Sequence, residues 1–337
     1  MWTPNGYIEN LYKSIHIKYQ FNATTQGEWQ SWHNDLRSQL KKLLGDFPKV
    51  NEDFQAVELE SKEFDTYIRK KVEITTFKNL RVPAYILTPQ NKPSNAPAIL
   101  TCVGHGHGYK EAIGLLPSEE SNQPSLHKNF AIQLVNKGFI VMVPEVLGFG
   151  DRRLEEDMDK SSNENSCYRL ATQLLMTGKT LAGHRVYEAI RFIDYLIEHE
   201  NVNSDRIGCM GFSGGGLVAG LTAALDDRIK ATVISCYNNT FKDSIMAMRH
   251  CLDNYIPNIL NYCEMSDIIS LIAPRHLFIE SGIHDDIFPV EGSKASIKNI
   301  QKAYDVLGLR NHLQVHLFDG KHEICGIQAY PWLEKRI

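Results

Sequence analysis

The chain has 337 residues, of which 43% are hydrophobic and 23% charged, the balance of an ordinary globular protein. This composition excludes a disordered chain, a collagen-like fibre and a coiled coil. The 36 Lys and Arg residues against 40 Asp and Glu give a net charge of −4, so no basic excess is present to neutralise the phosphates of a nucleic acid.

The N-terminus and the cysteines indicate a reducing compartment. The chain begins Met-Trp-Thr-Pro-Asn-Gly, without the positive segment and apolar core of a secretory signal. No apolar run is long enough to span a bilayer. The seven cysteines are odd in number, scattered, and form no C-x-x-C pair. We therefore expect a cytoplasmic protein with neither a membrane nor a nucleic acid as partner.

Residues 1 to about 70 are predicted to form an N-terminal helical extension. Apolar residues recur every three or four positions from Trp29 to Leu43, which is typical of an amphipathic helix, and Gly45 and Pro48 mark its end. We expect its apolar face to pack on the main domain. The alternative is a subunit contact in a homo-oligomer or a part of a lid.

Strand-like and helix-like segments alternate from residue 71 to residue 337. The predicted strands cover 71–77, 80–88, 98–103, 139–143, 206–211, 229–235, 277–280 and 313–318. The predicted helices cover 129–137, 186–197, 217–225 and 293–307. Such alternation predicts an α/β fold, with a mostly parallel central sheet and helices on both faces.

The first two of these strands and two long insertions depart from the alternating pattern. The first two strands are predicted to form an antiparallel hairpin, and Pro83 favours an edge position for the second of them. The insertions lie near residues 148–180 and 237–270. Both follow predicted strand ends, where open α/β sheets place their ligands, so we expect them to form walls of a substrate pocket.

The segment Gly211-Phe-Ser-Gly-Gly215 matches the motif G-x-S-x-G between a predicted buried strand and a small-residue helix. In this turn the serine adopts a strained backbone conformation, and glycines two residues before and after it avoid collisions. A P-loop would require a Gly-Lys-Ser/Thr ending, which is absent here. The pattern therefore favours Ser213 as a nucleophile at a helix N-terminus.

A serine nucleophile requires a general base and an orienting carboxylate, in the chain order Ser, Asp/Glu, His for this type of turn. Asp285 and Asp286 both follow the predicted strand 277–280, and His322 follows the last predicted strand. The residues alone leave the choice between the two aspartates open. The oxyanion donors are predicted to be the backbone N–H groups of Gly214 and His105.

Five stretches of the chain resemble the α/β-hydrolase superfamily, most closely its dienelactone-hydrolase-like and acetyl-xylan-esterase-like branch. They are residues 103–108, 143–152, 206–215, 282–289 and 319–322. The resemblance implies an α/β-hydrolase catalytic domain over residues 71–337, Asp285 as the catalytic acid, and the backbone of His105 as an oxyanion donor. One residue departs from the pattern: carbohydrate deacetylases of this branch usually carry Gln where Gly214 stands, which argues against a sugar acetate as substrate.

We therefore expect a serine hydrolase that cleaves a carboxylic ester of a small molecule through Ser213, His322 and Asp285, without a cofactor or metal. The resemblance implies a small acyl group. A serine peptidase of the same superfamily is one alternative. Another is a metal-dependent hydrolase in which the His105 and His107 pair supplies ligands.

Overall fold

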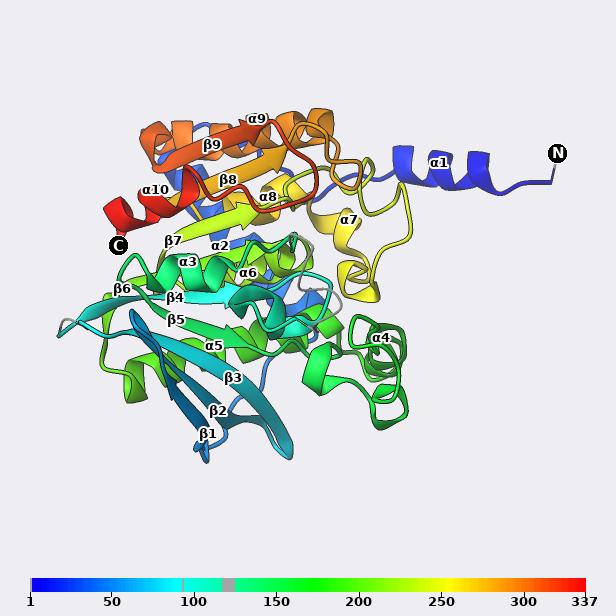
Figure 1. Ribbon diagram of the computed structural model, residues 1–337. Coiled ribbons are helices and arrows are strands. Elements are labelled where there is room, and N and C mark those ends of the chain that lie inside the picture. Colours follow the sequence, from blue (N-terminus) through cyan, green and yellow to red (C-terminus); the bar gives the residue numbers. More distant parts are fainter. Residues whose placement is uncertain (1, 93, 117–124) are drawn as a thin grey trace.

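The computed structural model describes residues 2–92, 94–116 and 125–337. Its centre is a nine-stranded sheet with the strand order β1-β2-β3-β5-β4-β6-β7-β8-β9 (Figure 1). The strands are β1 (Val57–Glu63), β2 (Tyr67–Phe77), β3 (Leu80–Pro89), β4 (Ala96–Cys102), β5 (Ile140–Pro144), β6 (Val202–Phe212), β7 (Ile229–Ser235), β8 (His276–Gly282) and β9 (Leu313–Phe318).

The predicted mostly parallel sheet is confirmed. Strands β1, β2, β3 and β5 pair antiparallel, and the six strands from β5 to β9 in the sheet order pair parallel. Every side chain of β4 is buried, which explains why its sequence is a continuous apolar run. The carboxyl ends of the parallel strands meet at one edge, on the right in Figure 1.

Helices cover both faces of the sheet. The α-helices are α1 (Asn5–Lys13), α2 (Gln26–Leu43), α3 (Phe130–Val135), α4 (Cys167–Met176), α5 (Leu181–His199), α6 (Gly214–Leu225), α7 (Ile259–Tyr262), α8 (Met265–Ser270), α9 (Val290–Val306) and α10 (Ala329–Arg336). One core cluster joins α2, α5, α6, α8 and α9 to one face of the sheet, and a second joins α3 and α10 to the other. Within the described ranges, none of the helices is both long and apolar enough to cross a membrane.

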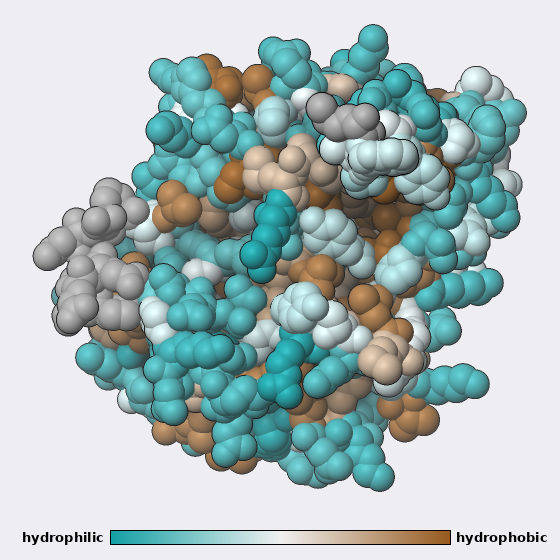
Figure 2. Space-filling model, turned by 90° about the vertical axis from the view of Figure 1, so that its right-hand side faces the viewer, coloured by the Kyte–Doolittle hydropathy of each residue, from teal (hydrophilic) through white to brown (hydrophobic). Residues whose placement is uncertain are grey.

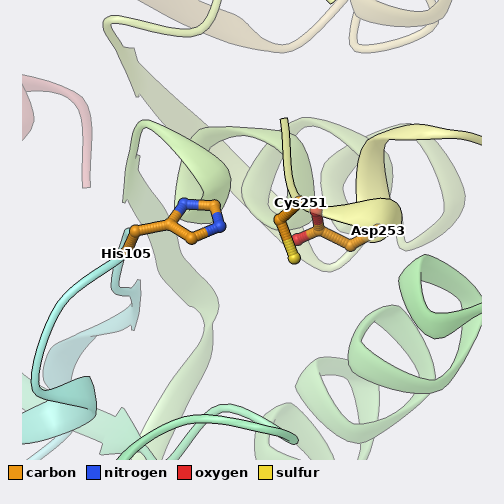
Figure 3. Close-up of side chains that lie close together, drawn as sticks. All are labelled: His105, Cys251 and Asp253. Atoms are coloured by element: carbon orange, nitrogen blue, oxygen red, sulfur yellow. The ribbon is translucent and has the colours of Figure 1, made fainter. Parts of the chain in front are cut away.

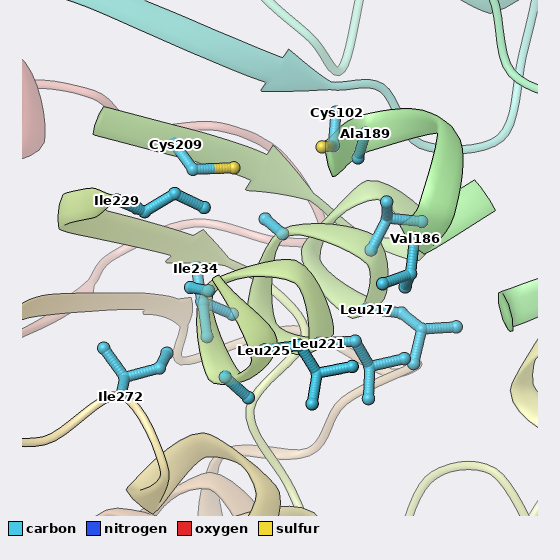
Figure 4. Packing of buried hydrophobic residues seen from close by; sticks show 14 of the residues in the cluster. Cys102, Val186, Ala189, Cys209, Leu217, Leu221, Leu225, Ile229, Ile234 and Ile272 are labelled. Carbon is cyan, nitrogen blue, oxygen red and sulfur yellow. The ribbon is translucent and has the colours of Figure 1, made fainter. Parts of the chain in front are cut away.

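Helix α6 lies at the centre of the larger core. All its residues are buried, and its glycine and alanine residues let the helix approach the sheet closely. Figure 4 shows Leu217, Leu221 and Leu225 following one another along this helix, with Val186 of α5 beside Leu217. The dense packing fixes the N-terminus of α6 at the carboxyl edge of the sheet.

The N-terminal segment packs along the second insertion. Helix α1 projects from the body in Figure 1, and none of its residues is buried. After it, the N–H of Tyr19 donates to the carbonyl of Tyr262 at 2.8 Å, and the N–H of Phe21 donates to Asp267 Oδ1 at 2.9 Å. In α2 the apolar stripe predicted from the sequence faces the core, where Leu40 is fully buried.

Two features of the sheet differ from the sequence-based expectation. Strand β1 and the first residues of β2 lie within residues 1–70, which were predicted to be helical. Strand β1 is exposed along its whole length, so it lacks the apolar alternation that marks a strand. Strand β3 is an interior strand, although Pro83 favoured an edge. The pairing of β3 with β5 covers Ala84–Leu87, so the missing N–H of Pro83 lies just beyond it.

Both insertions lie at carboxyl ends of strands and contact each other. Residues 148–180 contain α4 and the 3-10 turns η2 (Gly150–Arg152) and η3 (Glu155–Asp157). Residues 237–270 contain α7, α8 and the turn η4 (Leu252–Asn254). A small apolar cluster joins the two, with Phe149 and Cys167 on one side and Cys251 on the other.

The burial of the apolar face of α2 predicts that this helix contributes to the stability of the whole domain. Leu40→Ala should lower the free energy of unfolding by about 2–5 kcal/mol, because it removes a fully buried side chain and leaves a cavity. The exposed neighbour gives the control: Lys41→Ala should change it by less than about 0.5 kcal/mol. Urea denaturation of both variants measures this, and equal effects would contradict the integration of α2.

Candidate active site

Ser213 stands at the turn between β6 and α6 with a strained backbone. Its φ is 54° and its ψ is −125°, which a residue with a side chain adopts only when its surroundings enforce it. The two glycines of the motif make the turn possible. A Cβ on Gly211 would collide with the carbonyl of Gly215, and a Cβ on Gly215 would collide with the carbonyl of Cys102. The predicted nucleophile turn is present.

The structure brings Ser213, His322 and Asp285 together from three strand ends. His322 Nε2 lies 2.8 Å from Ser213 Oγ, and His322 Nδ1 lies 2.8 Å from Asp285 Oδ2. The Asp285 side chain is fully buried, whereas His322 is 14% exposed. These contacts place the Nδ1 proton toward the carboxylate and leave Nε2 free to accept the serine hydroxyl proton.

Asp285 and Asp286 have different environments. The Oδ1 atom of Asp285 accepts the backbone N–H groups of Ile287 and Phe288 at 2.8 and 2.9 Å, which fixes the carboxylate in the orientation that meets His322. Asp286 is exposed. The ring of Phe288 also stacks on His322, with centroids 5.7 Å apart. Of the two aspartates left open by the sequence, Asp285 contacts the histidine.

The loop after β4 lies against the start of α6. A Cβ on Gly214 would lie 3.1 Å from His105 Cε1, so these two predicted oxyanion residues are neighbours. His127 fixes the start of this loop, because its Nε2 accepts the N–H of Gly104 at 3.0 Å. Because Nε2 accepts, the proton of His127 resides on Nδ1, which faces Glu111 at 3.5 Å.

Glu145, which the sequence reasoning did not single out, joins this loop to the first insertion. It is 1% exposed and follows β5 directly. Its carboxylate accepts the backbone N–H groups of Tyr109, Val146 and Asp151, each at 3.0 Å. Tyr109 belongs to the 3-10 turn η1 (Gly108–Ile113), which continues the His105 loop. The only sequence signal was a charged residue directly after an apolar strand.

Burial raises the pKa of Glu145 to about 8, against the lowering effect of the three backbone N–H groups. The residue therefore holds its proton at neutral pH in the folded protein. A protonated carboxyl at this position joins two loops without placing a negative charge in the protein interior.

His105 also faces the second insertion. Figure 3 shows its ring opposite Cys251 and Asp253. Asp253 is buried and forms an ion pair with Arg185, whose guanidinium lies over the ring of Phe149. The insertions thus place apolar and ion-paired groups beside the predicted oxyanion donors.

The alternative of a metal site built on His105 and His107 finds no three-residue ligand group that contains both among the described residues. The ligand atoms of His105 lie close to those of Cys251 and Asp253. The Asp253 carboxylate, however, already forms an ion pair with Arg185. His107 belongs to none of the three-residue ligand groups found among the described residues, and its Nδ1 lies 2.6 Å from Ser162 Oγ.

The face that carries the site is open to solvent and mixed in character. Figure 2 shows this face, with apolar residues gathered near its middle and hydrophilic residues around them.

All seven cysteines, which lie in the described part of the chain, are free thiols. Cytoplasmic localisation stays a prediction.

Comparisons with known proteins agree with the fold. The model of the Abhydrolase family matches residues 2–324. A Bacillus subtilis protein named "Putative hydrolase YtaP" is 32% identical over 277 residues, which cover 80% of this chain and 87% of that protein. A solved "putative acetyl xylan esterase" from Bacteroides fragilis superposes with a TM-score of 0.84 at 17% identity, covering 100% of this chain and 96% of that chain.

A second solved structure is a glucuronoyl esterase from Solibacter usitatus. It superposes with a TM-score of 0.68 at 15% identity, covering 96% of this chain and 98% of that chain. These matches confirm the predicted α/β-hydrolase fold and the resemblance to acetyl-xylan-esterase-like proteins.

The pKa of Glu145 predicts a pH-dependent stability. Between pH 5.5 and 8 the folded state still holds most of a proton, falling to about half at pH 8, that the unfolded state, with a carboxyl pKa of 4.5, has released. The free energy of unfolding should therefore fall as the pH rises, by about 3 kcal/mol from this group over that interval. In Glu145→Gln this part of the slope should disappear. Urea denaturation at both pH values measures it, and an unchanged slope in the variant would contradict the buried protonated carboxyl.

Proposed function

The chain belongs to the Abhydrolase family, and on that premise we propose that it is a serine hydrolase that cleaves carboxylic esters with small acyl groups. The observation that carries the proposal is the continuous hydrogen-bond chain from Ser213 Oγ through His322 to Asp285, anchored on the strained turn. A buried serine in a structural role needs neither the strain nor this relay.

The first half of the proposed reaction forms an acyl-enzyme. His322 Nε2 takes the proton of Ser213 Oγ as the oxygen attacks the ester carbonyl carbon. Asp285 stabilises the imidazolium that results and holds the ring in place. The negative charge develops on the carbonyl oxygen, where the backbone N–H groups of Gly214 and His105 are proposed to donate. His322 then gives its proton to the leaving alcohol as the ester bond breaks.

The second half releases the acid. A water molecule gives a proton to His322 Nε2 and attacks the acyl carbon through the same tetrahedral geometry. The proton returns to Ser213 Oγ as its bond to the acyl carbon breaks, so the enzyme is regenerated without a cofactor.

The ester assignment rests on the descriptions of the proteins that share this fold and on the residues that surround Ser213. The superposed proteins named above are described as esterases, and no relative described there is a peptidase. The position of Gly214 carries no side chain, so a small acyl group can approach the nucleophile beside His105. The buried rings of Phe149 and Phe288 give the surroundings an apolar character.

An activated Ser213 should react covalently with a fluorophosphonate. The wild-type protein should gain a single adduct in its intact mass, and Ser213→Ala should gain none. Ser61→Ala, on the exposed strand β1, is the matched control and should label like the wild type. Folded wild-type protein that stays unlabelled would contradict the proposal.

The same preparations test the substrate class. The wild type should hydrolyse p-nitrophenyl acetate faster than the octanoate, and the corresponding acetanilide far more slowly. Ser213→Ala and His322→Ala should each lower kcat by roughly 10⁶-fold, and the double variant by little more, because the two residues act as one unit. Preferential cleavage of the anilide would instead support a peptidase.

The two neighbouring aspartates provide a second test. Asp285→Asn should lower kcat roughly 10⁴-fold, because the amide cannot hold and stabilise the imidazolium. Asp286→Asn should stay within about threefold of the wild type, since this side chain is exposed and does not contact His322. Steady-state rates on the acetate ester measure both, and a loss confined to Asp286→Asn would overturn the choice of acid.

A further inference from the structure

In the described part of the chain, three groups of His, Cys, Asp and Glu residues bring their ligand atoms within 4.8 Å of one another. Two of them have other partners. One contains the Asp285 and His322 pair, and another contains Asp253, which pairs with Arg185. The third group consists of Glu280, His316 and Cys325.

This third group joins two strands to the loop that carries His322. Glu280 of β8 and His316 of β9 are directly paired in the parallel ladder, so their side chains project from the same face of the sheet. Cys325 comes from the loop that follows β9. Its backbone N–H donates to Glu280 Oε1 at 3.3 Å, which brings the loop onto the strand pair.

The group has unused ligand capacity. The carboxylate of Glu280 is fully buried and accepts only from Ser235 Oγ at 2.8 Å and from two backbone N–H groups. No basic side chain among the described residues pairs with it. The Nδ1 atom of His316 is buried and has no hydrogen-bond partner there. A buried imidazole nitrogen without a partner is uncommon and requires an explanation.

The protonation states fit the binding of a divalent cation. Burial raises the pKa of Glu280 and that of the Cys325 thiol, and it lowers the pKa of His316, so burial disfavours the charged form of each group in the absence of an ion. A divalent cation bound by the Glu280 carboxylate, the Cys325 thiolate and the neutral His316 imidazole would meet two negative charges. The sum of these charges with the cation is zero, which suits a site whose carboxylate is buried.

We propose that Glu280, His316 and Cys325 bind a zinc-type divalent cation that holds the His322 loop against strands β8 and β9. One carboxylate oxygen, one imidazole nitrogen and one thiolate sulfur are ligands that Zn²⁺ prefers, and small side-chain rotations place them around one ion. Of the three residues, Cys325 also lines a surface hollow of about 490 Å³, from which water could reach its sulfur as a fourth ligand of the ion.

The role of this ion is structural. Glu280 precedes Asp285 on one strand and loop, and His316 and Cys325 flank His322 on the other. An ion bound to all three would fix the separation of the acid and the base without contacting the substrate. The inference does not depend on which bond the enzyme cleaves.

Cobalt is a spectroscopic probe for the site in the full-length protein. Protein freed of metal by dialysis against a chelator should bind one equivalent of Co²⁺ and show a thiolate-to-cobalt charge-transfer band, which Zn²⁺ then removes by displacement. Zn²⁺ should also raise the Tm of the wild type, because it binds the folded state. Cys325→Ser should lose the band, and Cys325→Ser and His316→Gln should each weaken binding more than about tenfold.

Cys251→Ser is the matched control, because Cys251 is the only cysteine of the ligand group around His105. It should keep the band and the Zn²⁺ effect on Tm. Circular dichroism of each variant confirms that it is folded; both Cys325 and His316 are only half-buried, so these substitutions are mild. A wild type without the band, or a band lost in Cys251→Ser and kept in Cys325→Ser, would overturn the proposal.

Discussion

The backbone of Ser213 is the constraint on which the rest of the site depends. A positive φ at a residue with a side chain is costly, and it persists only because the packing around the turn enforces it. Gly211 and Gly215 let β4, β6 and α6 approach within van der Waals contact of one another. The dense core around α6 then keeps the turn from relaxing. The packing of that core therefore holds the Ser213 hydroxyl at the carboxyl edge of the sheet.

Around this turn, buried carboxyl groups organise the loops at the strand ends. Asp285 accepts two backbone N–H groups, Glu145 accepts three, and Glu280 accepts two together with a serine hydroxyl. In each case the carboxyl oxygens accept backbone N–H groups of loops, as carbonyl oxygens do within helices and strands. Of the three, Asp285 additionally contacts His322, and burial raises the pKa of Glu145 and Glu280. Buried carboxyl groups that accept backbone N–H groups therefore shape several loops with different roles.

Much of this arrangement could be predicted from the sequence, because its signals are local. Continuous apolar runs mark buried strands, and the G-x-S-x-G motif marks a turn that few other sequences can form. Strand β1 escaped prediction because it is exposed on both faces and its pairing comes from β2 alone. Glu145 escaped because its partners are backbone N–H groups, one of which belongs to Tyr109, 36 positions earlier in the chain. The choice between Asp285 and Asp286 needed the orientation of one side chain, which no periodicity encodes.

The path of the N-terminal segment has a consequence for synthesis on the ribosome. The N–H of Phe21 and its acceptor Asp267 are 246 positions apart in the chain, and the segment before α2 runs along residues of the same distant insertion. The antiparallel pair β2 and β3 can form early from neighbouring residues, whereas the tryptophan-bearing face of α2 meets only nearby residues such as Phe21 until α6 and α9 have been translated. A segment that is made well before its partners is thus among the last to reach its native position, and the nascent chain must carry a partly uncovered apolar helix face in the meantime.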